Sequence, residues 1–115
     1  MLILLDNTRD YTEFCRTTAI YPGALERNTE ELVYLSLGLA GEAGEVANKV
    51  KKLLRDGKDM YSIDAVRQEL GDVMWYLTRL ADMLGVTLNE VMRLNTWKLQ
   101  SRADRGKLKG SGDNR

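Results

Sequence analysis

Two pairs of acidic residues, Glu42-x-x-Glu45 and Glu69-x-x-Asp72, are the groups in this sequence whose type and spacing suit chemistry. Residues three apart in a helix lie on neighbouring parts of one face, so each pair can direct two carboxylates towards one point. Four carboxylates from two packed helices would form an all-oxygen cage, which favours a hard cation such as Mg²⁺ or Mn²⁺. A Mg²⁺ ion held by few protein ligands normally serves a phosphate-bearing substrate. The pattern therefore predicts metal-dependent chemistry on a phosphoanhydride.

The absence of histidine and the single cysteine exclude several other kinds of site. The chain has no histidine and one cysteine, Cys15. A Cys–His catalytic pair and an internal disulfide are therefore excluded, and zinc, copper and non-haem iron sites, which usually use imidazole or thiolate, are disfavoured. A di-iron carboxylate bundle usually needs Glu-x-x-His pairs, which this sequence lacks. The lone cysteine fits a reducing, cytoplasmic compartment.

Length and charge narrow the class further. The 115 residues suffice for one domain, residues 1–115, and 17 basic and 17 acidic side chains cancel to a net charge of zero. This balance does not favour binding to a nucleic-acid polymer or a membrane surface. The apolar start, residues 1–5, is too short for a signal-peptide core or a membrane span. A chain of this size buries its apolar surface poorly alone, which favours self-association.

Amphipathic segments separated by turn residues predict the elements that must position the acids. Four helices are expected, and the segment 106–115, rich in glycine and polar groups, is expected to be a flexible or lid-like tail. Asn28 with Glu31, Ser62, and Thr87 with Glu90 are the expected helix-capping signals. The predicted helices cover approximately 8–17, 29–55, 63–84 and 88–101, with no alternating pattern typical of strands. The predicted fold class is all-α, resembling a four-helix bundle.

The acid at position 42 interrupts an apolar stripe. Leu35, Leu39, Glu42 and Val46 follow helical spacing, so Glu42 stands where a core residue is expected. An unpaired carboxylate in a core costs several kcal/mol, which a cation or a hydrogen-bonded partner must offset. Three glycines surround this turn at positions 38, 41 and 44, and each costs about 0.5–1 kcal/mol relative to alanine inside a helix. They indicate close approach by a neighbouring helix or a ligand. In the alternative interpretation, the acids are surface charges paired with Lys49, Lys52, Arg67 or Arg79.

The two acidic motifs together resemble a known family. Gly41-Glu42-Ala43-Gly44-Glu45-Val46, followed by Glu69-Leu70-Gly71-Asp72-Val73-Met74-Trp75-Tyr76-Leu77 and by Asn95-x-x-Lys98-x-x-x-Arg102, is similar to the MazG-like nucleoside triphosphate pyrophosphohydrolases of the short, single-domain type. The resemblance covers roughly residues 30 to 110. It implies an all-α fold, two or more Mg²⁺ or Mn²⁺ ions, and hydrolysis of an NTP or dNTP to monophosphate and pyrophosphate, for nucleotide-pool control or house-cleaning. It also implies a homodimer or a dimer of dimers whose sites draw on a neighbouring subunit.

The same resemblance suggests a role for each site residue. Glu42, Glu45, Glu69 and Asp72 are the expected metal ligands and catalytic groups, although one of them could act as the base for a water molecule. Asn95, Lys98 and Arg102 are expected to bind sugar or phosphate, with a solvated helix end as the alternative for the two cations. Trp75 is expected to pack at a subunit contact or to stack on the nucleobase.

The sequence leaves two alternatives to nucleoside triphosphate pyrophosphohydrolase activity. One is a non-enzymatic helical oligomerisation or interaction domain, in which the acids serve solubility alone. The other is a related all-α enzyme, such as a dUTPase, a dCTP pyrophosphatase or a phosphoribosyl-ATP pyrophosphatase.

Overall fold

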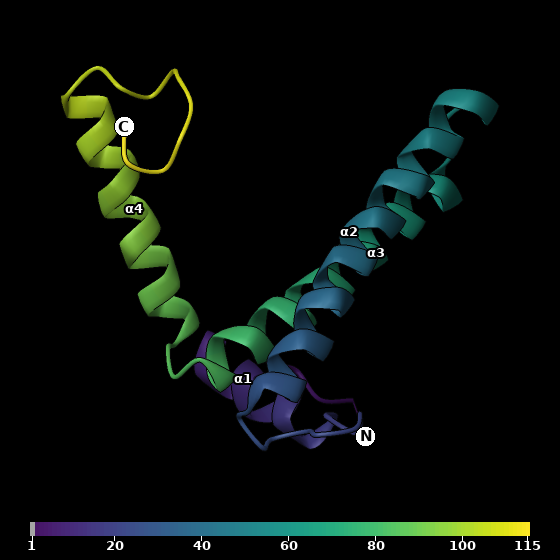
Figure 1. Ribbon diagram of the computed structural model, residues 1–115. Coiled ribbons are helices and arrows are strands. Elements are labelled where there is room, and N and C mark those ends of the chain that lie inside the picture. Colours follow the sequence, from purple (N-terminus) through teal and green to yellow (C-terminus); the bar gives the residue numbers. More distant parts are fainter. Residues whose placement is uncertain (1) are drawn as a thin grey trace.

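A computed structural model describes residues 2–115 of the protein as four helices without a strand (Figure 1). The all-α prediction is therefore confirmed. The helices are α1 (Thr8–Thr17), α2 (Thr29–Asp56), α3 (Met60–Met83) and α4 (Leu88–Asp104). Within residues 2–115, no helix is long and apolar enough to cross a membrane.

Each helix begins at a polar side chain that accepts a hydrogen bond from a backbone amide of the first turn. Asn7, Asn28, Asp59 and Thr87 have extended backbone geometry and cap α1 to α4 in that order. The prediction that Ser62 caps the third helix is wrong, because Asp59 accepts a hydrogen bond from the Ser62 amide at 2.7 Å and caps α3 three residues earlier. The turn after α2 needs Gly57, whose φ of 91° is unfavourable for other residues.

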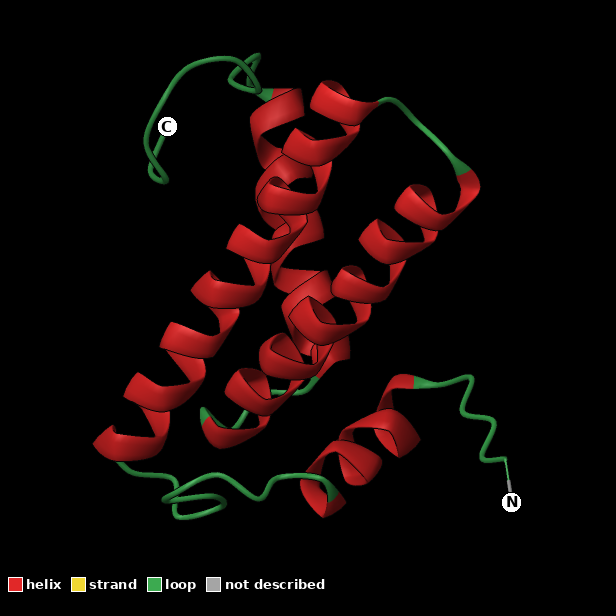
Figure 2. Cartoon of the chain, turned by 90° about the vertical axis from the view of Figure 1, so that its right-hand side faces the viewer, coloured by secondary structure: helices red, strands yellow, loops and turns green. Residues whose placement is uncertain are grey.

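Helices α2 and α3 form an antiparallel hairpin, and the short 57–59 connection makes them neighbours along their lengths (Figure 2). The core lies where the hairpin meets α1 and the 18–28 loop. Its buried centre comprises Tyr21, Leu35 and Met83, with partly buried apolar side chains packed around them. This core holds one end of the hairpin in place, and the acidic pairs lie further along it.

Helix α4 diverges from the hairpin and makes the molecule open (Figure 1). Within residues 2–115 it contacts α1 and α3 but not α2. The radius of gyration is 17.0 Å, whereas a compact chain of this length would have about 13 Å. Large apolar side chains are therefore exposed on both arms, including Leu37, Leu54 and Leu70 on the hairpin and Leu94 and Trp97 on α4. Within one chain the four helices therefore do not close into a complete bundle, because α4 does not pack along the α2–α3 hairpin.

Candidate metal and nucleotide site

Three of the four predicted acids converge between α2 and α3. Glu42, Glu69 and Asp72 each offer one carboxylate oxygen, and these three oxygens lie within 4.8 Å of one another. The first two side chains are partly buried and Asp72 is exposed. Glu45 is exposed and lies outside this tight set, one turn further along α2. The antiparallel hairpin brings the two motifs to about the same level because residues 42–45 and 69–72 lie at similar distances from the 57–59 connection.

The three acids lie close enough to repel one another, and both burial and this repulsion raise the pKa of Glu42. Partial burial raises the pKa of Glu42 above its ordinary value, and the adjoining Glu69 carboxyl together with the charges of Asp72 and Glu45 raises it further. A carboxylate held where its ionised form is unfavourable gains from a divalent cation. The donor set is all oxygen and carries excess negative charge, so it fits Mg²⁺ or Mn²⁺.

The alternative interpretation, in which basic side chains neutralise these acids at the surface, is supported by one ion pair. The Lys49 ammonium lies 3.9 Å from a Glu69 oxygen, at the outer limit of an ion pair. Arg67 pairs instead with Asp64, and Arg79 pairs with Glu31 and Asp82. One distant lysine does not balance three carboxylates, and the cluster keeps a net negative charge.

An open hollow of about 330 Å³ adjoins the acids and is lined by Glu42, Asp72, Trp75 and Tyr76. This volume is at the lower end of the range for small-molecule sites. Trp75 is anchored, because its indole N–H donates to the Thr18 hydroxyl at 2.8 Å and its ring lies edge-on to Tyr76 with centroids 5.0 Å apart. The hollow therefore combines carboxylates with two fixed aromatic rings, which suits a ligand with a charged part and a flat apolar part.

Gly38 allows the Tyr76 ring to lie directly against α2. A Cβ atom at position 38 would be 2.1 Å from Cε1 of Tyr76, so no larger residue fits without moving the ring. The close approach predicted from the glycines is thus made here by the neighbouring helix. Gly41 and Gly44 meet nothing within 4 Å among the described residues, which leaves the backbone beside Glu42 and Glu45 accessible.

The three predicted phosphate- or sugar-binding residues on α4 are not placed beside the acids by this chain. All three belong to α4, the arm that diverges from the hairpin (Figure 1). Asn95 and Lys98 are exposed, and Arg102 is buried at 5% exposure. Arg102 donates to the backbone carbonyls of Gly112 and Asp113 at 3.4 and 2.7 Å. The cations of α4 therefore form a second group, separate from the carboxylates.

A buried polar network near the site was missed by sequence reasoning. Glu31 is fully buried, although its position in the first turn of α2 indicates a capping role. It accepts hydrogen bonds from Tyr21 at 2.5 Å, from the amides of Leu25 and Arg27, and from Arg79 at 3.1 Å. Burial opposes ionisation of Glu31, but these donors outweigh it and hold its pKa below the ordinary value. The network joins α2, α3 and the 18–28 loop at the base of the hairpin.

A hollow of comparable size, about 310 Å³, lies between α1 and the start of α4. Its carboxylates are Glu13 and Asp82, and Asp82 is already bound by Arg16 and Arg79. Within the described chain it holds no converging set of acids, so the hairpin hollow is the better candidate for metal-dependent chemistry.

Comparison with known proteins identifies a family for this chain. Residues 30–106 match the model of the MazG nucleotide pyrophosphohydrolase domain. The chain is also 55% identical over 102 residues to the Gene 37 protein of Mycobacterium phage L5, an alignment that covers 85% of this chain and 90% of that protein. No solved structure shows a significant match. The family match spans both acidic motifs, the aromatic pair and the whole of α4.

Proposed function

The chain belongs to the MazG nucleotide pyrophosphohydrolase family, and from this premise we propose that it hydrolyses a (deoxy)nucleoside triphosphate at the α-phosphorus. The products are the nucleoside monophosphate and pyrophosphate. The observation that carries the proposal is the convergence of Glu42, Glu69 and Asp72 beside an aromatic hollow. The all-oxygen donor set supports Mg²⁺ or Mn²⁺ as the cofactor, with two or more ions per site.

The residues of the hairpin divide the work. Glu42, Glu69 and Asp72 would hold the divalent ions, and these would supply charge neutralisation of the triphosphate and a lowered pKa of bound water. Glu45, which lies outside the tight set, would accept the proton of the attacking water. Trp75 and Tyr76 provide a rigid wall for the base.

A nucleotide panel tests the reaction. With Mg²⁺ or Mn²⁺, at least one NTP or dNTP should yield monophosphate and pyrophosphate in equal amounts, resolved by ion-exchange chromatography. EDTA should abolish turnover, because the chain has no histidine or other group that could activate water as strongly at neutral pH. Stepwise release of orthophosphate would contradict attack at the α-phosphorus. A helical interaction domain without activity would also gain no thermal stability from metal plus nucleotide.

We propose that the working form is a homodimer or a dimer of dimers. The open arrangement of α4 and the exposed apolar side chains on both arms support association. In such an assembly, α4 of one copy supplies Asn95, Lys98 and Arg102 to the phosphates held by the hairpin of another.

Light scattering tests the assembly. At micromolar concentration the protein should have at least twice the mass of the 13.0 kDa chain. Trp97→Ala, which truncates a large side chain that is 62% exposed on α4, should weaken self-association. A wild-type monomer at this concentration would contradict the proposal.

A further inference from the structure

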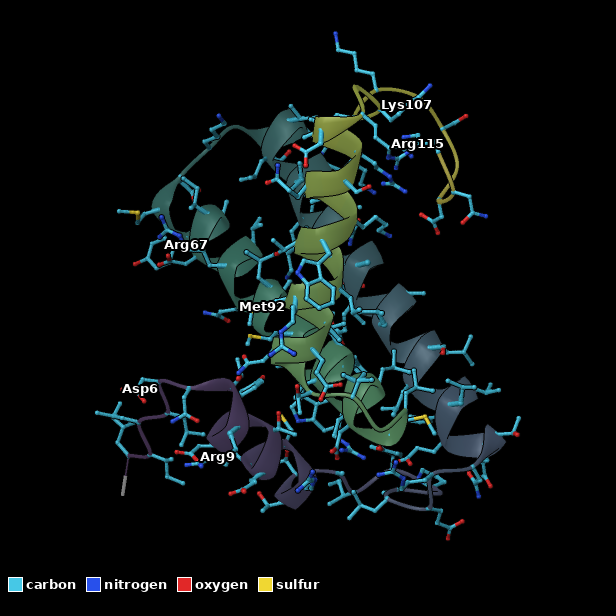
Figure 3. The ribbon with its side chains drawn as sticks, turned by 90° about the vertical axis from the view of Figure 1, so that its left-hand side faces the viewer. Asp6, Arg9, Arg67, Met92, Lys107 and Arg115 are labelled. Atoms are coloured by element: carbon cyan, nitrogen blue, oxygen red, sulfur yellow. The ribbon has the colours of Figure 1, made fainter. Side chains whose placement is uncertain are left out.

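The 106–115 loop turns back over the end of α4 instead of extending away from it (Figure 3). Arg115 holds its shape, because the guanidinium group donates to the backbone carbonyls of Lys107, Leu108 and Gly112 at 3.1, 3.2 and 2.6 Å. Arg105 donates to the backbone oxygen of Arg115 at 2.8 Å. Gly110 and Gly112 have φ values of 123° and 88°, which allow the reversal.

The loop places a carboxylate between the two cations expected to bind phosphate. Oδ1 of Asp113 lies 3.6 Å from Nζ of Lys98 and 3.7 Å from Nη2 of Arg102. The backbone carbonyl of Asp113 accepts a hydrogen bond from Arg102 at 2.7 Å. Lys98 and Arg102 are one helical turn apart on α4, so a single anion can contact both.

Arg102 is not fully satisfied by this arrangement. Its side chain is 6% exposed, and its Nε is buried without a hydrogen-bond partner among residues 2–115. A buried donor without an acceptor is unfavourable, whereas a phosphate group would engage Nε and Nη2 together. The Asp113 side chain is 88% exposed and contributes little stability in its present position. Arg102 therefore has an unsatisfied buried donor, and the Asp113 carboxylate beside it is held only weakly.

We propose that the 106–115 loop is an internal competitor for phosphate, with Asp113 standing at the Lys98–Arg102 anion site until a polyphosphate displaces it. This inference rests on the proposed function for the identity of the natural ligand. The class of ligand is a pyrophosphate group, either as part of a nucleoside triphosphate or as the released product. The loop must move for Arg102 to be reached, since its carbonyls cover the guanidinium.

Titration with inorganic pyrophosphate in the absence of divalent metal tests the competition directly. Asp113→Asn removes the competing carboxylate from the full chain, and affinity for pyrophosphate should rise about two- to fivefold, the range for loss of an exposed ion pair. Asp104→Asn is the matched control. It removes one negative charge from the same exposed helix end, where Asp104 contacts Gln100 but neither Lys98 nor Arg102. Equal affinities of the two variants would overturn the proposal.

Two further variants fix the location and the role of the loop. Arg102→Gln should reduce pyrophosphate affinity at least about tenfold, and unchanged affinity would place the anion elsewhere. Arg115→Gln should loosen the 106–115 loop, and it also removes a positive charge, which by itself would weaken pyrophosphate binding. Tighter pyrophosphate binding by this variant would therefore show that the loop covers the anion site. Weaker binding would show that Arg115 belongs to the anion site and would overturn the covering role. These titrations need no turnover, so a lack of triphosphate hydrolysis would refute the proposed function without deciding the loop.

Discussion

Glu42→Gln, Glu69→Gln and Asp72→Asn should each lower pyrophosphohydrolase activity by about a hundredfold or more. Each change keeps the shape of the side chain and removes one anionic ligand from oxygens that lie within 4.8 Å of one another. Mutation of the outer partners that support metal ligands commonly costs ten- to a hundredfold in metal affinity or activity, so loss of a direct ligand should cost at least as much as the upper part of that range. Steady-state rates measured over a range of Mg²⁺ concentrations check the prediction, and part of the loss should be recovered at high metal concentration.

Glu45→Gln separates the two roles assigned to the acids. Because Glu45 lies outside the tight set, its amide should lower kcat by about a hundredfold while leaving the Mg²⁺ requirement close to that of the wild type. Glu30→Gln is a matched control, since Glu30 is an exposed acid in the first turn of α2, far along the helix from the cluster. Full activity in any two of the four site variants would contradict the assignment.

The same amide variants should preserve or increase stability without metal. Burial and repulsion raise the pKa of Glu42 in the folded state, so ionisation of this group weakens folding. The contribution of Glu42 to folding stability is fully present below the pKa that this group has in the unfolded chain. It is lost as the pH rises through the higher pKa of the folded state. Glu42→Gln should remove this loss, and added Mg²⁺ should stabilise the wild type more than the variant.

Arg79→Met should lower the free energy of unfolding by about 3–5 kcal/mol, the cost of breaking a buried ion pair by removing one partner. The Arg79 side chain is 1% exposed and binds Glu31, Asp82 and the Tyr21 hydroxyl. Methionine keeps much of the volume but leaves the carboxylate of Glu31 buried without its cation. Denaturant unfolding monitored by circular dichroism at fixed protein concentration measures the change.

Arg67→Met provides the matched comparison. Arg67 lies on the same helix and pairs with Asp64, but both side chains are more than half exposed. Its loss should cost less than about 1 kcal/mol. A similar cost for the two substitutions would mean that the buried network does not stabilise the base of the hairpin.

The network also predicts how stability depends on acid. The pKa of Glu31 is held below its ordinary value of 4.5 in the folded state. Its contribution to stability is therefore complete above that value and is lost as the pH falls through the lowered folded pKa. Arg79→Met should make stability depend less on pH in this acidic range, since Arg79 is one of the donors that favour the ionised form of Glu31.

Local signals in the sequence determined the fold class and the chemical character of the site. Asn28 and the Thr87–Glu90 pair mark helix starts because capping depends on residues within one turn. The two acidic pairs were recognisable for the same reason, since three-residue spacing fixes a common helix face. The start of α3 was misplaced because Asp59 and Ser62 both suit a cap, and the choice depends on how the turn after Gly57 closes.

The tertiary structure decided which of these groups meet. Hairpin register brings Glu42 to Glu69 and Asp72 and leaves Glu45 outside this tight set, and in the same register the Tyr76 ring packs against Gly38. Burial of Glu31 with Arg79 joins residues 48 positions apart, which no helix periodicity encodes. The contact of Asp113 with Lys98 and Arg102 depends on a chain reversal after α4. Spacing along a helix thus determines which side chains share a face, but helix packing and loop paths determine which faces and charges come together.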